Sequence, residues 1–458
     1  MAITTTNPAT GVTEAEFEPH DAAEIERRLA EADAAARALR GTDFATRAAW
    51  MHATADLLDS EAEEVARLLT IEMGKPIAQS RAEVHKCVKN MRFYADRAEE
   101  FLADEALDDP SRVGASKAWT RYEPLGVVLA VMPWNYPLWQ VIRFAAPALM
   151  AGNAGVLKHA SNVPQSALYL DTLFERGGFP TGSFRTLLIG SAAVADIIAD
   201  RRVKAVTLTG SEPAGRSVAA TAGEHIKKTV LELGGSDPFI VLPSADVTRA
   251  AETAVTARVN NNGQSCIAGK RFIVHTDVYD EFVEAFSDRM GALVVGDPLE
   301  EATEVGPLAT ASGRDELADL VDDAVAKGAT VRVGGSAVDG PGWFYAPTVL
   351  EGITESMRLY AEEAFGPVAT VHRVRDLDEA VAVANSTTFG LSSSLWTNDA
   401  AEEKLVTASL DAGAVFINGM TVSYPELPFG GIKDSGYGRE LAASGIREFC
   451  NLKTVWKA

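Results

Sequence analysis

The sequence has little cysteine and no cluster of residues typical of a structural metal site. Its 458 residues include three cysteines, Cys87, Cys266 and Cys450, and seven histidines. No two cysteines form a C-x-x-C motif, and no histidines have the spacing of zinc ligands. A disulfide framework and a zinc-binding module are therefore excluded, and we predict no metal site.

The N-terminus lacks the basic and apolar segments of a signal peptide. The apolar run at 126–131 is far shorter than the ~20 residues of a membrane-spanning helix. Basic residues are few, because 42 Lys and Arg stand against 64 Asp and Glu, a formal net charge of -22. An acidic surface repels nucleic acid and anionic lipid. We therefore expect a cytoplasmic protein that binds neither, with an acidity that indicates either high solubility or adaptation to high salt.

Short apolar runs that alternate with amphipathic segments make up much of the remaining sequence. Helical patterns occupy most of 21–102, one of them continuous over 46–73. Strand-like runs then lie at 127–132, 155–157, 186–189, 203–208 and 229–233. Helical segments separate these runs, and the alternation restarts at residue 238. This order predicts two α/β units, each with a parallel sheet covered by helices.

One cysteine lies where a nucleophile could act. Cys266 stands in the stretch 260–271, between a polar, glycine-bearing loop and the apolar pair Ile267-Ala268. A thiolate there can attack a carbon electrophile while backbone N–H groups hold the resulting oxyanion. A lone cysteine is more often a small buried hydrophobe, and helix packing is our interpretation of Cys87.

Two further motifs follow predicted strands. The segment 133–137 continues directly from the strand 127–132, and its Asn135 can donate to an oxyanion. The segment 207–215 combines a strand, a tight turn and a helix start that can bind phosphate, although it lacks the G-x-G-x-x-G pattern. Each motif alone also fits an ordinary turn or helix cap.

Two more features of the sequence complete the five candidate functional motifs. Glu232 ends an apolar strand beside Gly234-Gly235, a setting that raises a carboxyl pKa and suits a general base. The glycine-rich loops 361–367 and 428–440 suggest backbone wrapped around a ligand. A solvent-facing glutamate and interdomain loops are the alternative interpretations.

In this order, the five motifs resemble the aldehyde dehydrogenase superfamily from Asn7 to the C-terminus. The segments 157–164 and 419–426 are most similar to the NAD(P)-dependent succinate-semialdehyde dehydrogenases. The resemblance implies that Cys266 attacks the aldehyde carbon, which then passes hydride to the nicotinamide. The remaining thioester is hydrolysed with Glu232 as base, and the oxyanion lies between the Asn135 side chain and the Cys266 N–H. Glu232 argues against the CoA-acylating relatives, which usually lack it.

The resemblance also implies a dinucleotide site. Lys158 is expected at the adenosine ribose, Ser211 at the pyrophosphate and Glu363 at the nicotinamide ribose. Phe365 is expected near the ring, and the predicted site also includes Trp134 and Gly210. NAD-preferring members often have Glu where this chain has Ser161, which removes a charge that repels a 2′-phosphate. We therefore expect NADP to be preferred and NAD to be accepted.

Substrate choice is expected to depend on Arg143, Ser423 and Tyr136. Arg143 and Ser423 replace residues that are commonly aromatic in relatives acting on uncharged aldehydes, and they could grip the carboxylate of succinic semialdehyde. Alternatively, Arg143 pairs with a structural acid. Glutarate semialdehyde as substrate, a cysteine hydrolase and a non-catalytic protein on the same scaffold remain alternatives.

The expected architecture is that of the aldehyde dehydrogenases. A Rossmann-like cofactor domain spans 1–103 and 125–235, and an α/β catalytic domain spans 236–440. A small β oligomerisation element at 104–124 and 441–458 is expected to join subunits of a homodimer or homotetramer. Ser265, Ile267 and Ala268 exclude a redox switch with a cysteine adjacent to Cys266, whereas a disulfide with Cys87 or Cys450 stays open.

Overall fold

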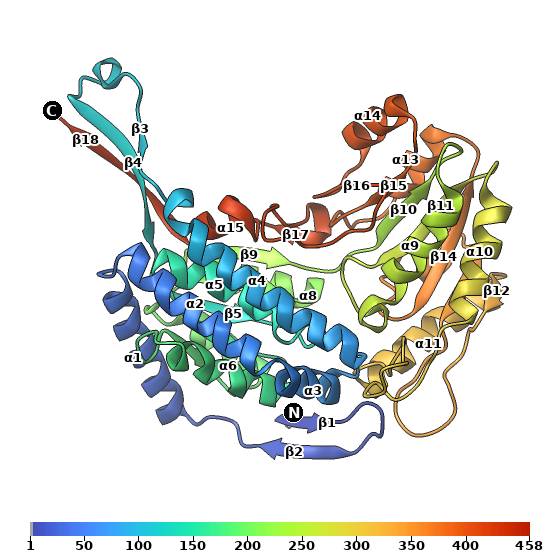
Figure 1. Cartoon of the computed structure of the whole chain (residues 1–458), viewed down its shortest axis with the longest axis horizontal. Helices are drawn as coiled ribbons and strands as arrows, with labels where there is room; N and C mark the ends of the chain where they lie inside the picture. Colours follow the sequence, from blue (N-terminus) through green and yellow to red (C-terminus); the bar gives the residue numbers. More distant parts are fainter. Residues whose placement is uncertain (1–2) are drawn as a thin grey trace.

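Two sheets of mostly parallel strands form two lobes of the chain (Figure 1). The computed structural model describes residues 3–458. The first sheet has the order β17-β9-β8-β5-β6-β7, and only β17 runs antiparallel to its neighbour. Its strands are β5 (Val127–Val131), β6 (Ala154–Lys158), β7 (Phe184–Thr186), β8 (Val203–Thr209), β9 (Lys228–Glu232) and β17 (Gly436–Tyr437).

Helices cover both faces of the first sheet. They are α1 (Ala22–Leu39), α2 (Phe44–Ser60), α3 (Ala62–Met73), α4 (Ile77–Phe101), α5 (Trp139–Ala151), α6 (Pro164–Arg176), α7 (Val194–Ala199), α8 (Glu212–Glu224) and α15 (Ala442–Glu448). Val128 and Ala130 pack with α4 and α5, whereas Val127 and Leu129 pack with α1, α7 and α8. Successive side chains of a strand point to opposite faces, so an all-apolar strand needs helices on both sides.

The second sheet has the order β12-β13-β14-β11-β10-β15-β16, with only β12 antiparallel to its neighbour. Its strands are β10 (Asp237–Val241), β11 (Gly269–His275), β12 (Thr330–Val333), β13 (Thr348–Glu351), β14 (Val368–Val374), β15 (Ser394–Trp396) and β16 (Phe416–Ile417). The helices of this lobe are α9 (Val247–Val259), α10 (Tyr279–Gly291), α11 (Ala311–Ala326), α12 (Arg358–Ala361), α13 (Leu377–Asn385) and α14 (Ala400–Ser409). The predicted α/β fold with two parallel-sheet units is confirmed.

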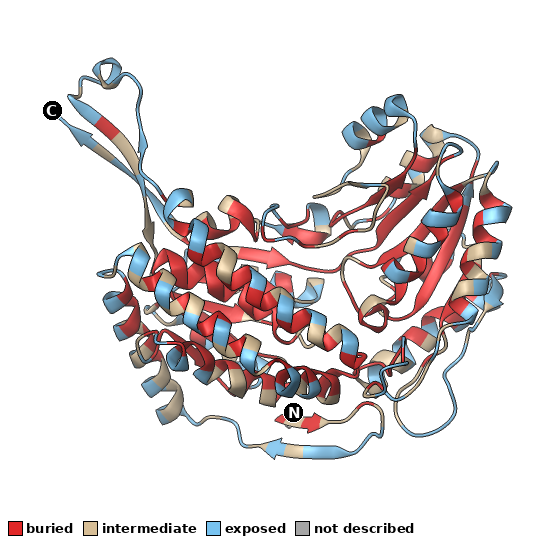
Figure 2. Cartoon of the chain, viewed as in Figure 1, coloured by how far each residue is buried: buried red, intermediate tan, exposed pale blue. Residues whose placement is uncertain are grey.

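A β arm projects from the first lobe, and its surface is mostly exposed (Figures 1 and 2). It consists of β3 (Glu105–Ala106), β4 (Lys117–Pro124) and β18 (Cys450–Lys457), with β18 antiparallel to β4 along its whole length. A separate hairpin of β1 (Ile3–Thr6) and β2 (Thr13–Phe17) precedes α1. No helix within residues 3–458 combines the length and apolar character needed to cross a bilayer.

Three of the predicted segments have different bounds in the structure. The helix predicted over 46–73 is two helices that part at Glu61, whose carboxylate accepts hydrogen bonds from Tyr169 and Arg176 of α6. The strand predicted at 186–189 is β7, which ends at Thr186. Within the predicted oligomerisation element, 441–449 belongs to the first lobe instead, because its apolar residues join the core around α4 and α5.

Candidate active site

Two cavities meet at Cys266. The first, of about 220 Å³, is lined by Asn135, Ser211 and other residues that follow strands of the first lobe, and by Glu363 and Phe365 of the second lobe. The second, of about 240 Å³, is lined mainly by α4, α5 and the loop 420–423. Cys266 and Gln140 line both cavities. A thiol at this junction can face two different ligands at once.

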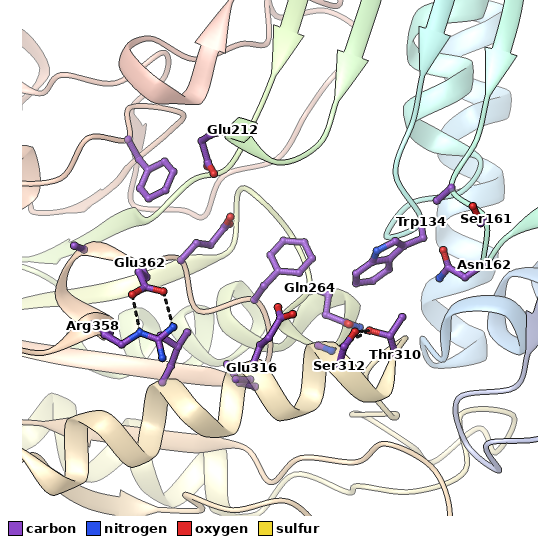
Figure 3. A pocket seen from close by; sticks show the side chains of 18 of the residues that line it. Trp134, Ser161, Asn162, Glu212, Gln264, Thr310, Ser312, Glu316, Arg358 and Glu362 are labelled. Carbon is purple, nitrogen blue, oxygen red and sulfur yellow. Dashed lines mark hydrogen bonds and ion pairs between the residues drawn. The ribbon is translucent and has the colours of Figure 1, made fainter. Parts of the chain in front are cut away.

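A long groove of about 870 Å³ continues from the first cavity, with which it shares Trp134, Glu363 and Phe365. Figure 3 shows Ser161 and Asn162 on one side of this groove and Ser312 and Glu316 of α11 on the other. The groove therefore runs between the two lobes. All seven residues predicted for the cofactor line the groove or the first cavity: Trp134, Lys158, Ser161, Gly210, Ser211, Glu363 and Phe365.

Asparagine and lysine side chains fix the loop that carries Cys266. Asn261 and Asn262 adopt left-handed backbone conformations, with φ of 60° and 57°, which asparagine tolerates better than most residues. The Asn261 Nδ2 donates to the backbone oxygens of Asn135 and Gln264 at 2.7 and 2.9 Å. The Lys270 Nζ donates to the backbone oxygens of Ser265 and Cys266, each at 2.8 Å. The cysteine is thus held on a rigid turn.

The Asn135 amide is oriented toward this turn. Its Oδ1 accepts a hydrogen bond from Gln140 Nε2 at 3.0 Å, and its Nδ2 donates to the Gln264 backbone oxygen at 3.0 Å. An amide nitrogen carries two hydrogens, so one N–H remains for a ligand in the cavity. Gln140 decides which end of the amide faces Cys266, a role that the sequence analysis missed.

A buried ion pair supports the loop around Asn135. The Glu83 Oε1 accepts from the backbone N–H groups of Leu138 and Trp139, at 2.8 Å each, where α5 begins. Its Oε2 pairs with the Lys75 ammonium, which also lies 4.3 Å from the centre of the Tyr136 ring. Neither charge is accessible to solvent, so each depends on the other. Tyr136 lines the second cavity, as the sequence analysis expects.

The surroundings of Cys266 favour the protonated thiol. Burial raises its pKa to about 12, against the lowering effect of the positive charges of Lys270 and Arg143. A thiolate is the reactive form, so attack on a carbonyl requires a group that accepts the proton. Among residues 3–458, no histidine lines either cavity at Cys266.

Glu232 ends β9 and is fully enclosed. Neither carboxylate oxygen has a hydrogen-bond partner within residues 3–458. Burial, and next the charge of Glu440, raise the Glu232 pKa to about 8. Gly430 makes room for this carboxylate, because a Cβ there would lie 2.8 Å from Glu232 Oε1. The loop 428–440 thus encloses a site residue. Glu232 is not among the residues lining the two cavities, so contact with a ligand requires a rotated side chain or a water between them.

Arg143 lines the second cavity, but its charge has a partner. Its guanidinium forms an ion pair with Glu440, and both side chains are almost completely buried. Its Nη2 donates to Thr209 Oγ1 at 3.4 Å, and the group stacks 4.7 Å from the Phe429 ring centre. Arg143 thus pairs with an acid of the protein, Glu440, which is the alternative raised from the sequence. Ser423, the other predicted substrate residue, lines the same cavity.

Two lysines at this site are not among the residues predicted from the sequence. Lys270 forms an ion pair with Glu363 at 2.9 Å and so connects the cysteine turn to a predicted cofactor residue. Lys86 projects from α4, and its Nζ donates to Ser423 Oγ at 2.7 Å. Lys270 belongs to the same stretch as Cys266, so its proximity could have been suspected. Nothing near Lys86 in the sequence indicates a site.

The three thiols are unpaired. Cys87 is fully buried in the core around α4 and α5, in agreement with the predicted packing role. Cys450 lies at the start of β18, and its Sγ donates to the Ile446 backbone oxygen at 3.4 Å. Cys266 is therefore the one thiol that lines the cavities described above.

Comparisons with known proteins agree with this geometry. The aldehyde dehydrogenase family model matches residues 1–455. A succinate-semialdehyde dehydrogenase (NADP(+)) of Mycobacterium avium is 64% identical over 457 residues, covering 100% of this chain and 97% of that protein. Another of that name, from Mycobacterium tuberculosis, is 61% identical over 458 residues, covering 100% of both.

The solved structures agree as well. A crystal structure of succinic semialdehyde dehydrogenase from Streptococcus pyogenes in complex with NADP+ has a TM-score of 0.96 and 37% identity, covering 99% of each chain. The resemblance inferred from the five motifs is thereby confirmed, and the chain belongs to the aldehyde dehydrogenase family.

Proposed function

We propose that the protein oxidises succinic semialdehyde to succinate with NADP, through a covalent intermediate on Cys266. The observation that carries this proposal is the position of Cys266 between the first cavity, which continues into the long groove, and the second cavity, which is lined by Lys86 and Arg143. The relatives named as NADP-dependent succinate-semialdehyde dehydrogenases support the same substrate and cofactor. NAD is expected to be accepted less well.

The groove has the donors and acceptors that a dinucleotide phosphate requires. Lys158 and Ser161 offer an ammonium and a hydroxyl, and the buried Asn162 Nδ2 next to them has no hydrogen-bond partner within residues 3–458. These three groups can donate hydrogen bonds to a phosphate, whereas the Glu363 carboxylate can accept hydrogen bonds from ribose hydroxyls. When bound, the nicotinamide ring supplies the hydride acceptor for the reaction.

The chain's own residues account for the remaining chemistry. The Cys266 thiol passes its proton to solvent, its sulfur adds to the aldehyde carbon, and the free Asn135 N–H stabilises the negative oxygen that forms. Once oxidised, the carbon is held as a thioester. Glu232 then takes a proton from water, which attacks the thioester carbon and releases the acid and the thiol. The elevated Glu232 pKa suits this role, because the carboxylate is basic enough to accept a proton from water during attack.

The first experiment is to follow reduced nicotinamide with succinic semialdehyde and butyraldehyde, each with NADP and with NAD. We expect the highest kcat/KM for succinic semialdehyde with NADP. Equal activity on both aldehydes would contradict the substrate assignment while keeping the Cys266 chemistry. No turnover with any combination would favour a non-catalytic protein on this scaffold.

Ser161→Glu is expected to shift the preference from NADP toward NAD by at least ~10-fold, because a carboxylate beside Lys158 repels a 2′-phosphate and accepts bonds from ribose hydroxyls. The ratio of kcat/KM values for the two cofactors measures this effect. Ser312→Glu is the matched control, since it adds the same charge on the opposite wall of the groove. An unchanged ratio in the Ser161 variant would contradict the assigned phosphate position.

We also propose that the β arm joins subunits of a homodimer or homotetramer. Leu452 and Trp456 of β18 are 56% and 52% exposed, an unusual exposure for large apolar side chains on a projecting strand.

Glutarate semialdehyde stays an alternative substrate, because one methylene changes the free energy of binding by only ~1–3 kcal/mol. A cysteine hydrolase is disfavoured by the lack of histidine at the two cavities within the described residues.

A further inference from the structure

The Lys270 ammonium connects two loops that carry site residues. Lys270 lies at the start of β11, and its Nζ donates to the backbone oxygens of Ser265 and Cys266, each at 2.8 Å. The same nitrogen forms an ion pair with Glu363 Oε1 at 2.9 Å. An ammonium has three hydrogens, so these three oxygens account for all of them. The side chain is 2% exposed, and water therefore does not compete for the contacts.

The two loops also pack against each other with no space for a side chain between them. Gly263 of the cysteine turn lies against the loop 361–367, where a Cβ on Gly263 would come within 2.4 Å of the Gly366 backbone. Gly235, which follows β9, is equally close to the turn, because a Cβ there would lie 2.5 Å from the Cys266 backbone oxygen. In packing this tight, a displacement of one loop displaces the other.

The carboxylate at this junction faces a ligand site. Glu363 lines both the long groove and the first cavity, and its side chain is 17% exposed. Burial raises the Glu363 pKa, and the charge of Lys270 acts in the opposite direction. An ionised carboxylate is a stronger acceptor for hydroxyl groups than a neutral carboxyl. Lys270 thus favours the ionised form of a groove residue while it holds the backbone of the nucleophile.

We propose that Lys270 is a positioning residue that couples the dinucleotide groove to the Cys266 turn. It acts on the groove through the Glu363 carboxylate, and on the turn through the backbone oxygens of Ser265 and Cys266. The inference rests on the proposed function, in which the ligand of the groove is NADP. It does not depend on which aldehyde is the substrate.

Lys270→Met is expected to raise the Kd for NADP by ~10-fold, because Glu363 without the ammonium takes up a proton and becomes a weaker acceptor. Quenching of tryptophan fluorescence measures this Kd in the absence of substrate. Lys270→Arg keeps the charge and is expected to restore most of the affinity. Thr370→Val is the matched control, since Thr370 Oγ1 donates to the Lys270 backbone oxygen at 3.2 Å and its loss leaves the ammonium in place. This control is expected to change the Kd by less than about twofold.

A double-mutant cycle tests whether Lys270 acts through Glu363. Glu363→Gln is expected to raise the Kd for NADP by ~10-fold, since the charged acceptor is lost. The double variant Lys270→Met/Glu363→Gln is then expected to bind NADP about as weakly as Glu363→Gln alone. Multiplied losses would overturn the coupling. The double variant also covers the case in which Lys270→Met alone does not fold, because it leaves no buried carboxylate without a partner.

Alkylation of Cys266 by iodoacetamide, followed by peptide mass spectrometry, reports on the other side of the junction. Without NADP, Lys270→Met is expected to slow alkylation by ~10-fold, because the Lys270 charge favours the reactive thiolate. Glu363→Gln is expected to accelerate alkylation, since the Glu363 charge acts on the thiol in the opposite direction. A purely structural Lys270 would leave both the Kd and the alkylation rate of the folded variant unchanged, and that result would overturn the inference.

The proposed function fails separately from this inference. A lack of preference for succinic semialdehyde would contradict the proposed substrate and would alter neither readout, because both are taken without substrate. If the unmodified protein did not bind NADP, the proposed cofactor would be wrong. Alkylation would then decide alone: opposite effects of the two single variants would support the link between Glu363, Lys270 and the thiol, and unchanged rates would overturn it.

Discussion

Cys266→Ala is expected to lower kcat by roughly 10⁴–10⁶-fold for every aldehyde, because the variant has no sulfur to form the covalent intermediate. The loss is expected with both cofactors. Alanine fills less space than cysteine and introduces no charge, so the cavities and the groove stay open. NADP binding, followed by quenching of tryptophan fluorescence, is therefore expected to be close to that of the unmodified protein, with Trp134 lining the groove as the reporter.

Cys450→Ala supplies the control for this variant. The Cys450 thiol is partly buried and lies outside the cavities at Cys266, so its removal is expected to leave kcat within about twofold. Retained turnover in Cys266→Ala would contradict a covalent mechanism at this position. Equal inactivation of both variants would indicate a structural role for the thiols instead.

Strong periodicity in the sequence predicts the regular elements well. One of the helical segments predicted between the strand-like runs is α6, between 155–157 and 186–189. β15 (Ser394–Trp396) was missed because it begins at the end of a run of three serines, 392–394, which are buried in the folded chain, where the Ser393 hydroxyl donates to the Ala414 backbone oxygen. α11 was also missed, although its Thr310 cap and its apolar residues at helical spacing carry a readable pattern.

Site residues could be predicted from the sequence only where they belong to a recognisable motif. The resemblance of five motifs was enough to predict that Cys266, Asn135 and the cofactor residues belong to one site, which the structure divides between the groove and the first cavity. It could not reveal partners that are distant in sequence. Lys86 meets Ser423 across 337 positions, and Arg143 meets Glu440 across a similar interval. A single sequence contains no information on which of many charged residues meet in space, so the pairing of Arg143 could only be stated as an alternative.

Glu232→Gln is expected to separate the two halves of the reaction. If Glu232 activates the water that hydrolyses the thioester, the variant still forms the thioester, and about one equivalent of reduced nicotinamide per site appears in a rapid burst. Steady-state turnover is then expected to fall by ~10²–10⁴-fold, because general base catalysis is lost. Glutamine is isosteric with protonated glutamate, which predominates below a pKa of about 8, so the fold is expected to tolerate the change.

The pH dependence gives the same prediction a second readout. In the unmodified protein, kcat limited by hydrolysis is expected to increase as the pH rises toward about 8, because the Glu232 carboxylate then loses its proton and can act as a base. This increase is expected to vanish in Glu232→Gln. The Cys266 thiol, with a pKa of about 12, also requires a proton acceptor. If the burst disappears together with the steady state, Glu232 serves that earlier step instead, and the assignment to hydrolysis is wrong.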